Sequence, residues 1–521
     1  MRRPLFEHLC FFVQIRSSAP CGTALLALSL GLAACDDATS PGGASGLTFA
    51  VQPASTDLEG SLTPGLPGVT VVIQDDQGLT VPEWTKPVTL SLVSGSAGAL
   101  TGTRTVEPVG GTAVFPDLQV TEAGSAYQLV ARSGKLTEAT SEPFDVHAVF
   151  TSASVTAGNN HTCALTDDGT AYCWGANHSG QLGDGTRTAR SMPVAVEMDE
   201  TFTALTAEGS HTCGLTEAGT AYCWGENQYG QLGTETTETC AHPTEGDVRP
   251  CSPLPLTVDG GRVWDQLAAG SSHTCGLTPQ GEMHCWGSNW FGQLGVGDGV
   301  NESLTPLPVS GGHRFVTMGA GRTHSCGLDG DGKVYCWGRN WFGEVGDDSW
   351  TGDDSWTTER FEPVPVVGDQ QFVFLSLSGW FYPRTCAITA EGRTFCWGRG
   401  YWDLEIGSRF VPVPSPLIED PGFDTVAAGG YMTCGLTPDG ALYCWGEGEH
   451  GRLGTGGASS ASHPTAVLPE KRFASVSPGC DHTCAVTVEG ATYCWGSNDR
   501  GQLGRESPGA GWTVPVPVWK E

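Results

Sequence analysis

The chain has 521 residues, enough for two or more domains of ~150 residues each. Its 74 glycines are about twice the usual share of ~7%, and they show no Gly-X-Y period, which excludes collagen and indicates turn-rich β structure. The 26 basic and 57 acidic residues give a net charge of −31, so we expect no nucleic-acid partner, and the 20 cysteines indicate an oxidising compartment.

Residues 1–34 have the features of a signal peptide. Arginines precede an apolar run at 24–34, which is too short to cross a bilayer. The run leads into Leu-Ala-Ala-Cys35, which resembles the lipobox of bacterial lipoproteins, and this resemblance implies that Cys35 is lipidated after cleavage. We therefore expect a protein of the bacterial cell envelope, anchored by lipid and facing the periplasm or the exterior, with residues 35–46 as a flexible tether. The alternative is an ordinary cleavage site followed by an unrelated cysteine.

Residues 47–148 predict an antiparallel β-sandwich. Short alternating runs separated by turn clusters fall at 47–51, 69–73, 88–92, 112–115 and 127–130. The phrase Val-Val-Ile-Gln-Asp-Asp-Gln-Gly at 71–78 resembles bacterial Ig-like domains of the invasin type. This resemblance implies a stalk that holds the next domain away from the membrane, and ligand binding by the sandwich itself is the alternative.

Residues 149–521 contain seven copies of one phrase, His-Thr-Cys-x-Leu-Thr-x-x-Gly-x-x-Tyr-Cys-Trp-Gly-x-Asn-x-x-Gly-Gln-Leu-Gly. The first cysteines of successive copies are 48 to 62 residues apart. Each copy predicts a hairpin with one further strand on either side, so the fold class is all-β, a seven-bladed β-propeller preceded by the sandwich. The repeat resembles the regulator-of-chromosome-condensation repeat family; copy five departs from it at 398–407, where the Asn is missing and one residue is added.

The two ends of the predicted propeller indicate how the ring closes. The C-terminal segment 513–518 matches the Pro-Val strand of the other copies, whereas segment 150–158 has no such strand before it. We therefore expect both ends to share one blade, which would remove an exposed sheet edge.

The cysteines of the repeats are predicted to form disulfides. A zinc site is the alternative, but copies five and six keep both cysteines while Arg384 and Met432 replace the histidine. Cys480 is left without an evident partner, and we expect a free or buried thiol there. The predicted pairs are Cys163–Cys173, Cys213–Cys223, Cys240–Cys251, Cys275–Cys285, Cys326–Cys336, Cys386–Cys396, Cys434–Cys444 and Cys484–Cys494.

The histidines and tryptophans that recur once per copy are predicted to be structural, hydrogen-bonded or packed between blades. The Gly-x-Gly-x-x-Gly match at 446–451 is only a variant of the repeat, because no helix pattern follows it. The duplicated Asp-Asp-Ser-Trp at 347–350 and 353–356 favours a solvated insertion over a calcium site. We find no catalytic motif, and we expect no cofactor and no metal.

Large aromatic residues occur where the copies differ, in the loop after Cys-Trp-Gly, and only in three neighbouring copies. Strand direction places this loop on the same face as the loop before His-Thr-Cys, which is enlarged in copy five. Aromatic side chains often anchor binding interfaces, and the alternative is that they only fill glycine-rich loops. The predicted ligand-binding residues are Trp290, Phe291, Trp341, Phe342, Trp380, Phe381, Tyr382, Tyr401 and Trp402.

These features favour a lipid-anchored interaction protein whose propeller binds an envelope or extracellular protein, peptide or glycan. An inhibitor of a secreted enzyme is one alternative. Family resemblance also implies guanine-nucleotide exchange activity, which export, disulfides and acidity disfavour. An enzyme with groups around the central channel is the third class.

Overall fold

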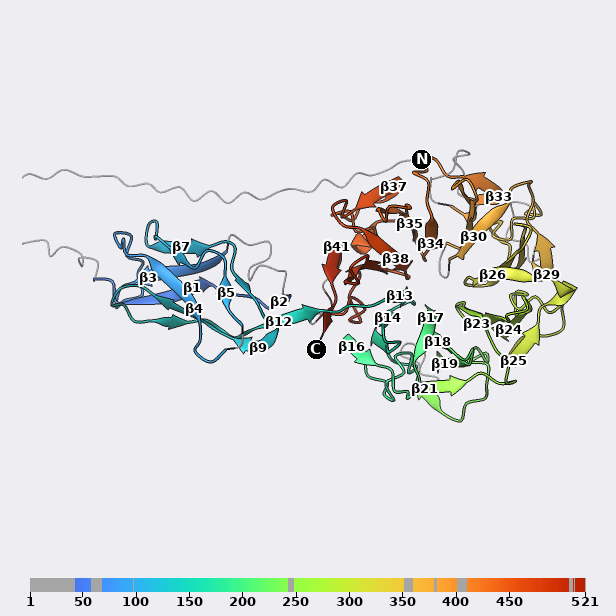
Figure 1. Cartoon of the computed structure of the whole chain (residues 1–521), viewed down its shortest axis with the longest axis horizontal. Helices are drawn as coiled ribbons and strands as arrows, with labels where there is room; N and C mark the ends of the chain where they lie inside the picture. Colours follow the sequence, from blue (N-terminus) through green and yellow to red (C-terminus); the bar gives the residue numbers. More distant parts are fainter. Residues whose placement is uncertain are drawn as a thin grey trace, which may run out of the picture.

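The structure is a computed structural model that describes residues 43–57, 68–96, 98–241, 248–350, 359–378, 382–400, 410–505, 509 and 511–520. Over these residues the elements are β-strands, with only short 3-10 helices such as η1 (Ser310–Gly312) and η3 (Glu449–Gly451), so the all-β prediction is confirmed. Figure 1 shows a small β domain beside a ring of sheets. Cys35 and the rest of 1–42 lie outside the described residues.

The first domain, called here the N-terminal β domain, buries one shared core. Its larger sheets have the orders β1-β3-β7 and β11-β10-β4-β6, and the inward positions of these strands include Val71, Leu90 and Phe115. Its strands are β1 (Gly46–Val51), β2 (Thr56–Asp57), β3 (Val69–Gln74), β4 (Val88–Leu92), β5 (Leu100–Thr101), β6 (Thr105–Val106), β7 (Thr112–Phe115), β8 (Gln119–Val120), β9 (Gly124–Tyr127), β10 (Leu129–Arg132), β11 (Ala139–Thr140) and β12 (Phe144–Val149).

The single strand predicted at 127–130 is wrong, because the structure divides this segment between two strands. β9 ends at Tyr127 and pairs with β12, whereas β10 begins at Leu129 and pairs with β4. The chain therefore changes sheets at Gln128, although the alternation of apolar residues continues through that point.

The described residues after β12 form seven antiparallel sheets that follow one another in chain order, and we number them 1 to 7. Six of these sheets are built from four consecutive strands, and sheet 2 has a fifth strand, β20 (Thr239–Ala241), which lies between its third and fourth strands in the sequence. The first strands face the centre of the ring in Figure 1: β13 (Ser154–Ala157), β17 (Phe202–Glu208), β22 (Gln266–Ala269), β26 (Phe315–Ala320), β30 (Phe372–Leu377), β34 (Thr425–Ala428) and β38 (Phe473–Pro478).

The second and third strands of each sheet form the predicted hairpin, and the fourth strand lies outermost except in sheet 2, where β20 pairs with its outer side. The second strands are β14 (His161–Leu165), β18 (His211–Thr216), β23 (His273–Leu277), β27 (His324–Asp329), β31 (Arg384–Thr389), β35 (Met432–Leu436) and β39 (His482–Thr487). The third strands are β15 (Ala171–Gly175), β19 (Ala221–Glu226), β24 (Met283–Ser288), β28 (Val334–Gly338), β32 (Thr394–Arg399), β36 (Leu442–Gly446) and β40 (Thr492–Gly496). The fourth strands are β16 (Arg190–Ala195), β21 (Val248–Thr257), β25 (Glu302–Pro308), β29 (Arg360–Pro365), β33 (Phe410–Pro416), β37 (Ala461–Val467) and β41 (Trp512–Pro517).

The ring closes without a shared strand. Sheet 7 takes all four strands from β38 to β41, so the prediction that the two ends share one blade is wrong. The start of the ring instead bonds to sheet 7 through the backbone, where the Ser152 N–H donates to the Gly490 carbonyl at 2.9 Å. The corresponding bond between sheets 1 and 2 runs from Phe202 to Gly169 at 2.8 Å. Closure therefore repeats a contact also made between sheets 1 and 2.

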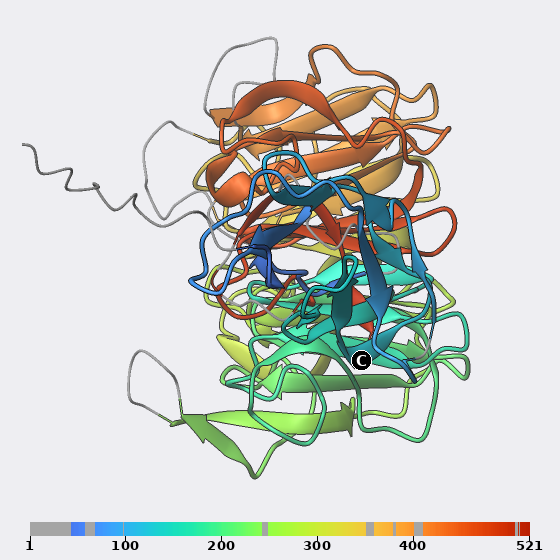
Figure 2. The same cartoon turned by 90° about the vertical axis from the view of Figure 1, so that its left-hand side faces the viewer.

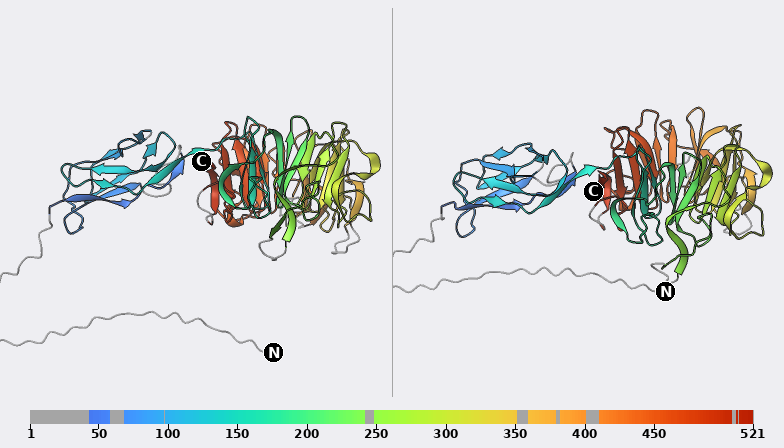
Figure 3. Two further views of the ribbon diagram at one scale, coloured as in Figure 1. Left: turned by 90° about the horizontal axis from the view of Figure 1, so that it is seen from below. Right: turned by 60° about the horizontal axis from the view of Figure 1, so that its bottom comes forward.

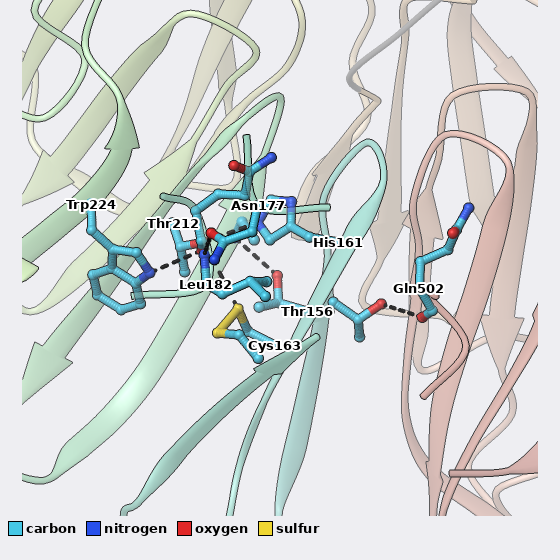
Figure 4. Close-up of a disulfide and its surroundings, with 12 residues drawn as sticks. Thr156, His161, Cys163, Asn177, Leu182, Thr212, Trp224 and Gln502 are labelled. Carbon is cyan, nitrogen blue, oxygen red and sulfur yellow. Dashed lines mark hydrogen bonds between the residues drawn. A yellow bond between two sulfur atoms is a disulfide. The ribbon is translucent and has the colours of Figure 1, made fainter. Parts of the chain in front are cut away.

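Neighbouring sheets are held together by the tryptophan after each second cysteine. Trp224 of sheet 2 lies in one buried cluster with Leu182 and the Cys163–Cys173 disulfide of sheet 1, as Figure 4 shows. Its indole N–H donates to the Gln181 carbonyl at 3.0 Å, and Trp174, Trp286, Trp337 and Trp495 make the same kind of bond to the preceding sheet. The prediction that these tryptophans pack between blades is confirmed.

The N-terminal β domain joins the ring through one strand. The first part of β12 pairs with β9 and β2, and its last residues, Ala148 and Val149, pair with β42 (Trp519–Lys520) at the C-terminus. The imidazole of His147 stacks on the Trp519 indole with ring centroids 4.1 Å apart. The last described residues therefore pair with, and stack on, the strand that leads into the ring (Figure 1).

Candidate interaction face

The recurring histidines link neighbouring sheets. Their imidazole groups are buried and hydrogen-bonded, so they are not available to bind a ligand. His161 is fully buried, and its Nε2 lies 2.9 Å from the Thr212 hydroxyl of the next sheet (Figure 4). His211, His273, His324 and His482 make the same contact with Thr274, Ser325, Thr385 and Thr162 at 2.8 to 3.0 Å. Burial lowers the pKa of these five side chains to about 3 or 4. The prediction of a structural role is confirmed.

Two sheets depart from this arrangement. Arg384 takes the histidine position in sheet 5, and its Nη1 donates to the Thr433 hydroxyl of sheet 6 at 2.8 Å. Met432 takes the position in sheet 6, and its thioether side chain is fully buried there. The hydroxyl that would face it, on Thr483, donates to the Arg452 carbonyl at 3.0 Å.

The predicted disulfides are confirmed. The seven hairpin pairs each join directly opposed residues of the second and third strands, and Cys240–Cys251 braces the hairpin of β20 and β21. Cys480 is free and buried, as expected. Burial raises the pKa of its thiol, and the neighbouring Asp481 carboxylate adds to the effect, so this thiol is not poised as a nucleophile.

One face of the ring carries the loops that follow the third strands. Each third strand runs towards this face and ends in the Trp-Gly-x-Asn loop, so we call it the Asn-loop face. The braced hairpin of sheet 2 leaves the ring on the same side and projects from it in Figures 2 and 3. The Thr-x-x-Gly turns between the second and third strands lie on the opposite face.

A buried asparagine fixes the shape of each regular loop on this face. The Asn289 side chain accepts a hydrogen bond from the Leu294 N–H at 2.9 Å, and Asn177, Asn227, Asn340 and Asn498 do the same five residues along. This bond closes the loop over Gly292, whose positive φ of 83° suits glycine. The two residues after the asparagine are therefore presented from a rigid base.

The structure brings several of the predicted site residues together on this face. Phe291 and Trp341 meet edge to face with ring centroids 5.5 Å apart, and Trp290 beside them is 57% exposed. Phe342 stacks on Phe410 at 5.4 Å. The predicted residues Trp380, Phe381, Tyr401 and Trp402 lie outside the described residues.

Tyr382 extends the group of rings towards sheet 6. Its ring lies 5.3 Å from that of Tyr431, and its hydroxyl donates to the Glu447 carboxylate at 2.6 Å. Tyr431 is a contact that the repeat pattern did not suggest, because it stands before the second strand rather than in the Asn loop. Burial raises its pKa to about 12.

Arginines lie between these rings, and they were not among the residues predicted from the sequence. Arg339 lies over Trp341 and Phe342, at 4.9 and 5.7 Å from the ring centroids. Arg399 lies over Phe342 and Tyr382 at 5.1 and 4.1 Å, and Arg452 lies over Tyr431 at 4.4 Å. Rings and guanidinium groups thus alternate across sheets 3 to 6. The signal was available, because Arg339 and Arg399 occupy the variable position directly after Trp-Gly.

Carboxylates pair with the most buried of these arginines. Arg339 bonds Glu344 at 3.1 Å, and Arg452 bonds Asp481 at 3.1 Å. Burial raises the pKa of Glu344 even though Arg339 acts to lower it. Burial also raises the pKa of Glu208, which stands at the end of an inner strand, to about 7. The ion pairs of Arg339 and Arg452 hold these two guanidinium groups against the rings.

The described part of the chain shows no group of three or more side chains suited to a metal. Within the same residues, no helix has the length and apolar character to cross a bilayer.

A ring of antiparallel sheets with one variable face defines a β-propeller of the repeat class. The chain belongs to the RCC1-like domain family, whose model matches residues 121–468, and the regulator of chromosome condensation (RCC1) repeat matches residues 473–502. The resemblance seen in the sequence is therefore confirmed.

Curated relatives share the repeats but are longer proteins. The ultraviolet-B receptor UVR8 of Arabidopsis thaliana is 30% identical over 249 residues, which are 47% of this chain and 41% of that protein. The probable E3 ubiquitin-protein ligase HERC4 of Homo sapiens is 34% identical over 323 residues, 60% of this chain and 29% of that protein. The chain thus spans less than half the length of these relatives.

Solved structures support the fold alone. Yeast RCC1 (Prp20), in its complex with Kap60, superposes with a TM-score of 0.57 at 22% identity, covering 71% of this chain and 85% of that one. Human WBSCR16 gives a TM-score of 0.55 at 20% identity, covering 77% and 98%.

Proposed function

We propose that this chain is an exported binding protein that captures a protein or peptide partner on the Asn-loop face of a seven-bladed propeller. The observation that carries the proposal is the cluster of Trp290, Phe291, Trp341 and Phe342, which gathers on the face from which the hairpin of β20 and β21 also projects. Rigid, partly exposed aromatic side chains bury large contact areas at a low entropic cost. A glycan is the alternative ligand for the same rings.

Export and anchoring belong to the same proposal. Eight disulfides and a leader ending in Leu-Ala-Ala-Cys35 support a lipid anchor in the bacterial envelope, with the N-terminal β domain as an Ig-like stalk. The continuous strand β12, clasped by Trp519, suits a stalk that fixes the direction of the ring. Replacing Cys35 with Ser should release the protein from the membrane fraction, and intact-mass analysis should show the loss of the acyl chains.

We propose binding rather than catalysis, and we assign no activity from the relatives. A light receptor and ubiquitin ligases share these repeats, so the fold does not select among functions. The arginines of the Asn-loop face are engaged by rings and carboxylates, which suits a fixed recognition surface. Guanine-nucleotide exchange remains disfavoured for an exported, disulfide-bonded chain.

The test is capture from an envelope extract of the source organism. The immobilised chain would be compared with the Trp290→Ala/Trp341→Ala variant, and bound proteins and glycans would be quantified by mass spectrometry. Trp84→Ala, a partly exposed tryptophan of the N-terminal β domain, is the matched control. A protein held by the wild type and the control but lost from the double variant supports the proposal. Retention by all three places binding elsewhere, and a glycan lost in the same way makes the ligand a glycan.

A further inference from the structure

The most exposed ring of the Asn-loop face stands on a fixed base. Trp290 is 57% exposed, and the next residue, Phe291, donates its backbone N–H to the Gln293 side chain at 3.0 Å. Phe291 in turn packs edge to face on Trp341 of sheet 4. Trp290 therefore presents an indole to solvent from a loop whose neighbours are already ordered.

Carboxylates lie in the loop that carries Trp290 and on the neighbouring strand β29. The same loop bonds to strand β29 through the Gly297 N–H and the Phe361 carbonyl at 2.9 Å. Between them lies a cavity of about 430 Å³, lined by Gly297, Asp298, Glu359, Arg360, Phe361, Glu362 and Val364. Asp298 and Glu362 are exposed, and Glu359 lies half-buried beside Trp341. A basic group bound at Trp290 would therefore lie beside a loop and a strand that carry carboxylates.

The arginines nearby do not cancel these charges. Arg339 is engaged by Glu344 at 3.1 Å, and Arg360 is engaged by Asp347 at 2.6 Å. Asp298 and Glu362 form no ion pair with any residue in the part of the chain that the structure describes. The local excess is negative, as is the whole chain at −31.

An arginine of the chain itself already lies against two rings of this face. The guanidinium of Arg339 lies 4.9 Å from the Trp341 centroid and 6.0 Å from that of Phe291, on the sheltered side of the pair. A cation within about 6 Å of an indole face is attracted by the ring electrons. Trp290 offers the same kind of surface on the solvent side.

We propose that the partner of the Asn-loop face presents a basic segment, with a Lys or Arg side chain over Trp290 that is paired with Asp298 and Glu362. This inference rests on the proposed function and adds the chemistry of the partner. The net negative charge of the chain steers such a segment towards the ring and repels acidic ones.

The test measures direct binding of defined peptides to the full chain by fluorescence anisotropy. The probes are a fluorescein-labelled peptide of alternating Arg and Gly and a Glu–Gly peptide of the same length, with free spermidine as competitor. Asp298→Asn/Glu362→Gln and, separately, Trp290→Ala should each weaken binding of the Arg–Gly peptide about tenfold. The matched control is Glu217→Gln/Glu391→Gln, which removes two exposed charges from the opposite face and should change affinity less than about twofold.

Each other outcome overturns the inference. Equal weakening by both double variants would mean that only the overall field attracts the peptide. Preference for the Glu–Gly peptide would mean that the partner segment is acidic rather than basic. No binding of either peptide would mean that this face does not recognise a charged segment. Displacement by spermidine as effective as by unlabelled peptide would make the ligand a small polyamine. Partner capture that still depends on Trp290 and Trp341, without binding of the Arg–Gly peptide, would leave the proposed function intact and overturn this inference alone.

Discussion

Arg339 and Glu344 form a buried ion pair across one Asn loop of sheet 4, with a distance of 3.1 Å between Nε and Oε1. The same two positions in sheets 3 and 7 hold Ser and Gln, which bond through Gln293 and Ser288 at 3.2 Å and through Gln502 and Ser497 at 3.4 Å. In sheet 6 the charges are exchanged, with Glu447 and Arg452 at these positions. One contact of the repeat is thus made in three chemical forms.

The charged form of this contact should be replaceable only as a pair. Arg339→Ser alone leaves the Glu344 carboxylate buried without its cation, and we expect it to lower the free energy of unfolding by about 3–5 kcal/mol. Arg339→Ser/Glu344→Gln restores the form found in sheets 3 and 7 and should come within ~1 kcal/mol of wild type. Urea denaturation of the three proteins measures the difference, and a double variant as unstable as the single one would contradict the exchange.

The histidine–hydroxyl bond that joins neighbouring sheets is missing between sheets 6 and 7, because Met432 occupies the histidine position of sheet 6. Gly429 stands three residues before it, as Gly158 stands before His161, and in sheet 1 the imidazole lies against this glycine. Met432→His should therefore reach the Thr483 hydroxyl and raise the free energy of unfolding by about 1 kcal/mol, the usual net value of a hydrogen bond. Thermal unfolding tests this, with Met432→Leu as the control for the change in shape. A loss of stability in the His variant alone would show that sheet 6 cannot accommodate the ring.

Much of this architecture can be read from the repeat, because recurrence reports contacts that every sheet must make. The hairpin disulfides, the tryptophans between sheets and the buried histidines were all predictable on that ground. The change of sheets at Gln128 was not, because apolar alternation continues through it. Ring closure was misjudged because the Ser152–Gly490 bond is made by the backbone, which carries no residue signature.

The candidate site was predictable in part, for a related reason. Trp290, Phe291, Trp341 and Phe342 depart from the repeat and so stand out in the sequence. Arg339 and Arg399 depart from it too, but a long charged side chain at one loop position does not reveal that it lies over rings of its own and neighbouring loops. Geometry was needed to connect them.

Acid should weaken the links between sheets. The pKa of His161 is about 3 in the folded chain and ~6.5 when unfolded, so its contribution is complete above pH ~6.5 and is lost as the pH falls towards 3. Each of the five histidines should add up to ~1.4 kcal/mol per pH unit to this loss. His161→Met, which uses the residue found in sheet 6, should make the free energy of unfolding fall less steeply between pH 6 and pH 4. An unchanged slope would mean that His161 is already protonated in the fold.

Glu208 should have the opposite pH dependence. Burial raises the pKa of its carboxyl from 4.5 to about 7, so the folded chain carries no penalty below pH ~4.5 and the full penalty above pH ~7. Glu208→Gln should therefore stabilise the protein at pH 8 by roughly 1–3 kcal/mol and leave it nearly unchanged at pH 4. The exposed Glu217→Gln is the matched control and should have no such pH-dependent effect. If Glu208→Gln gave equal gains at both pH values, amide packing rather than the buried charge would be responsible.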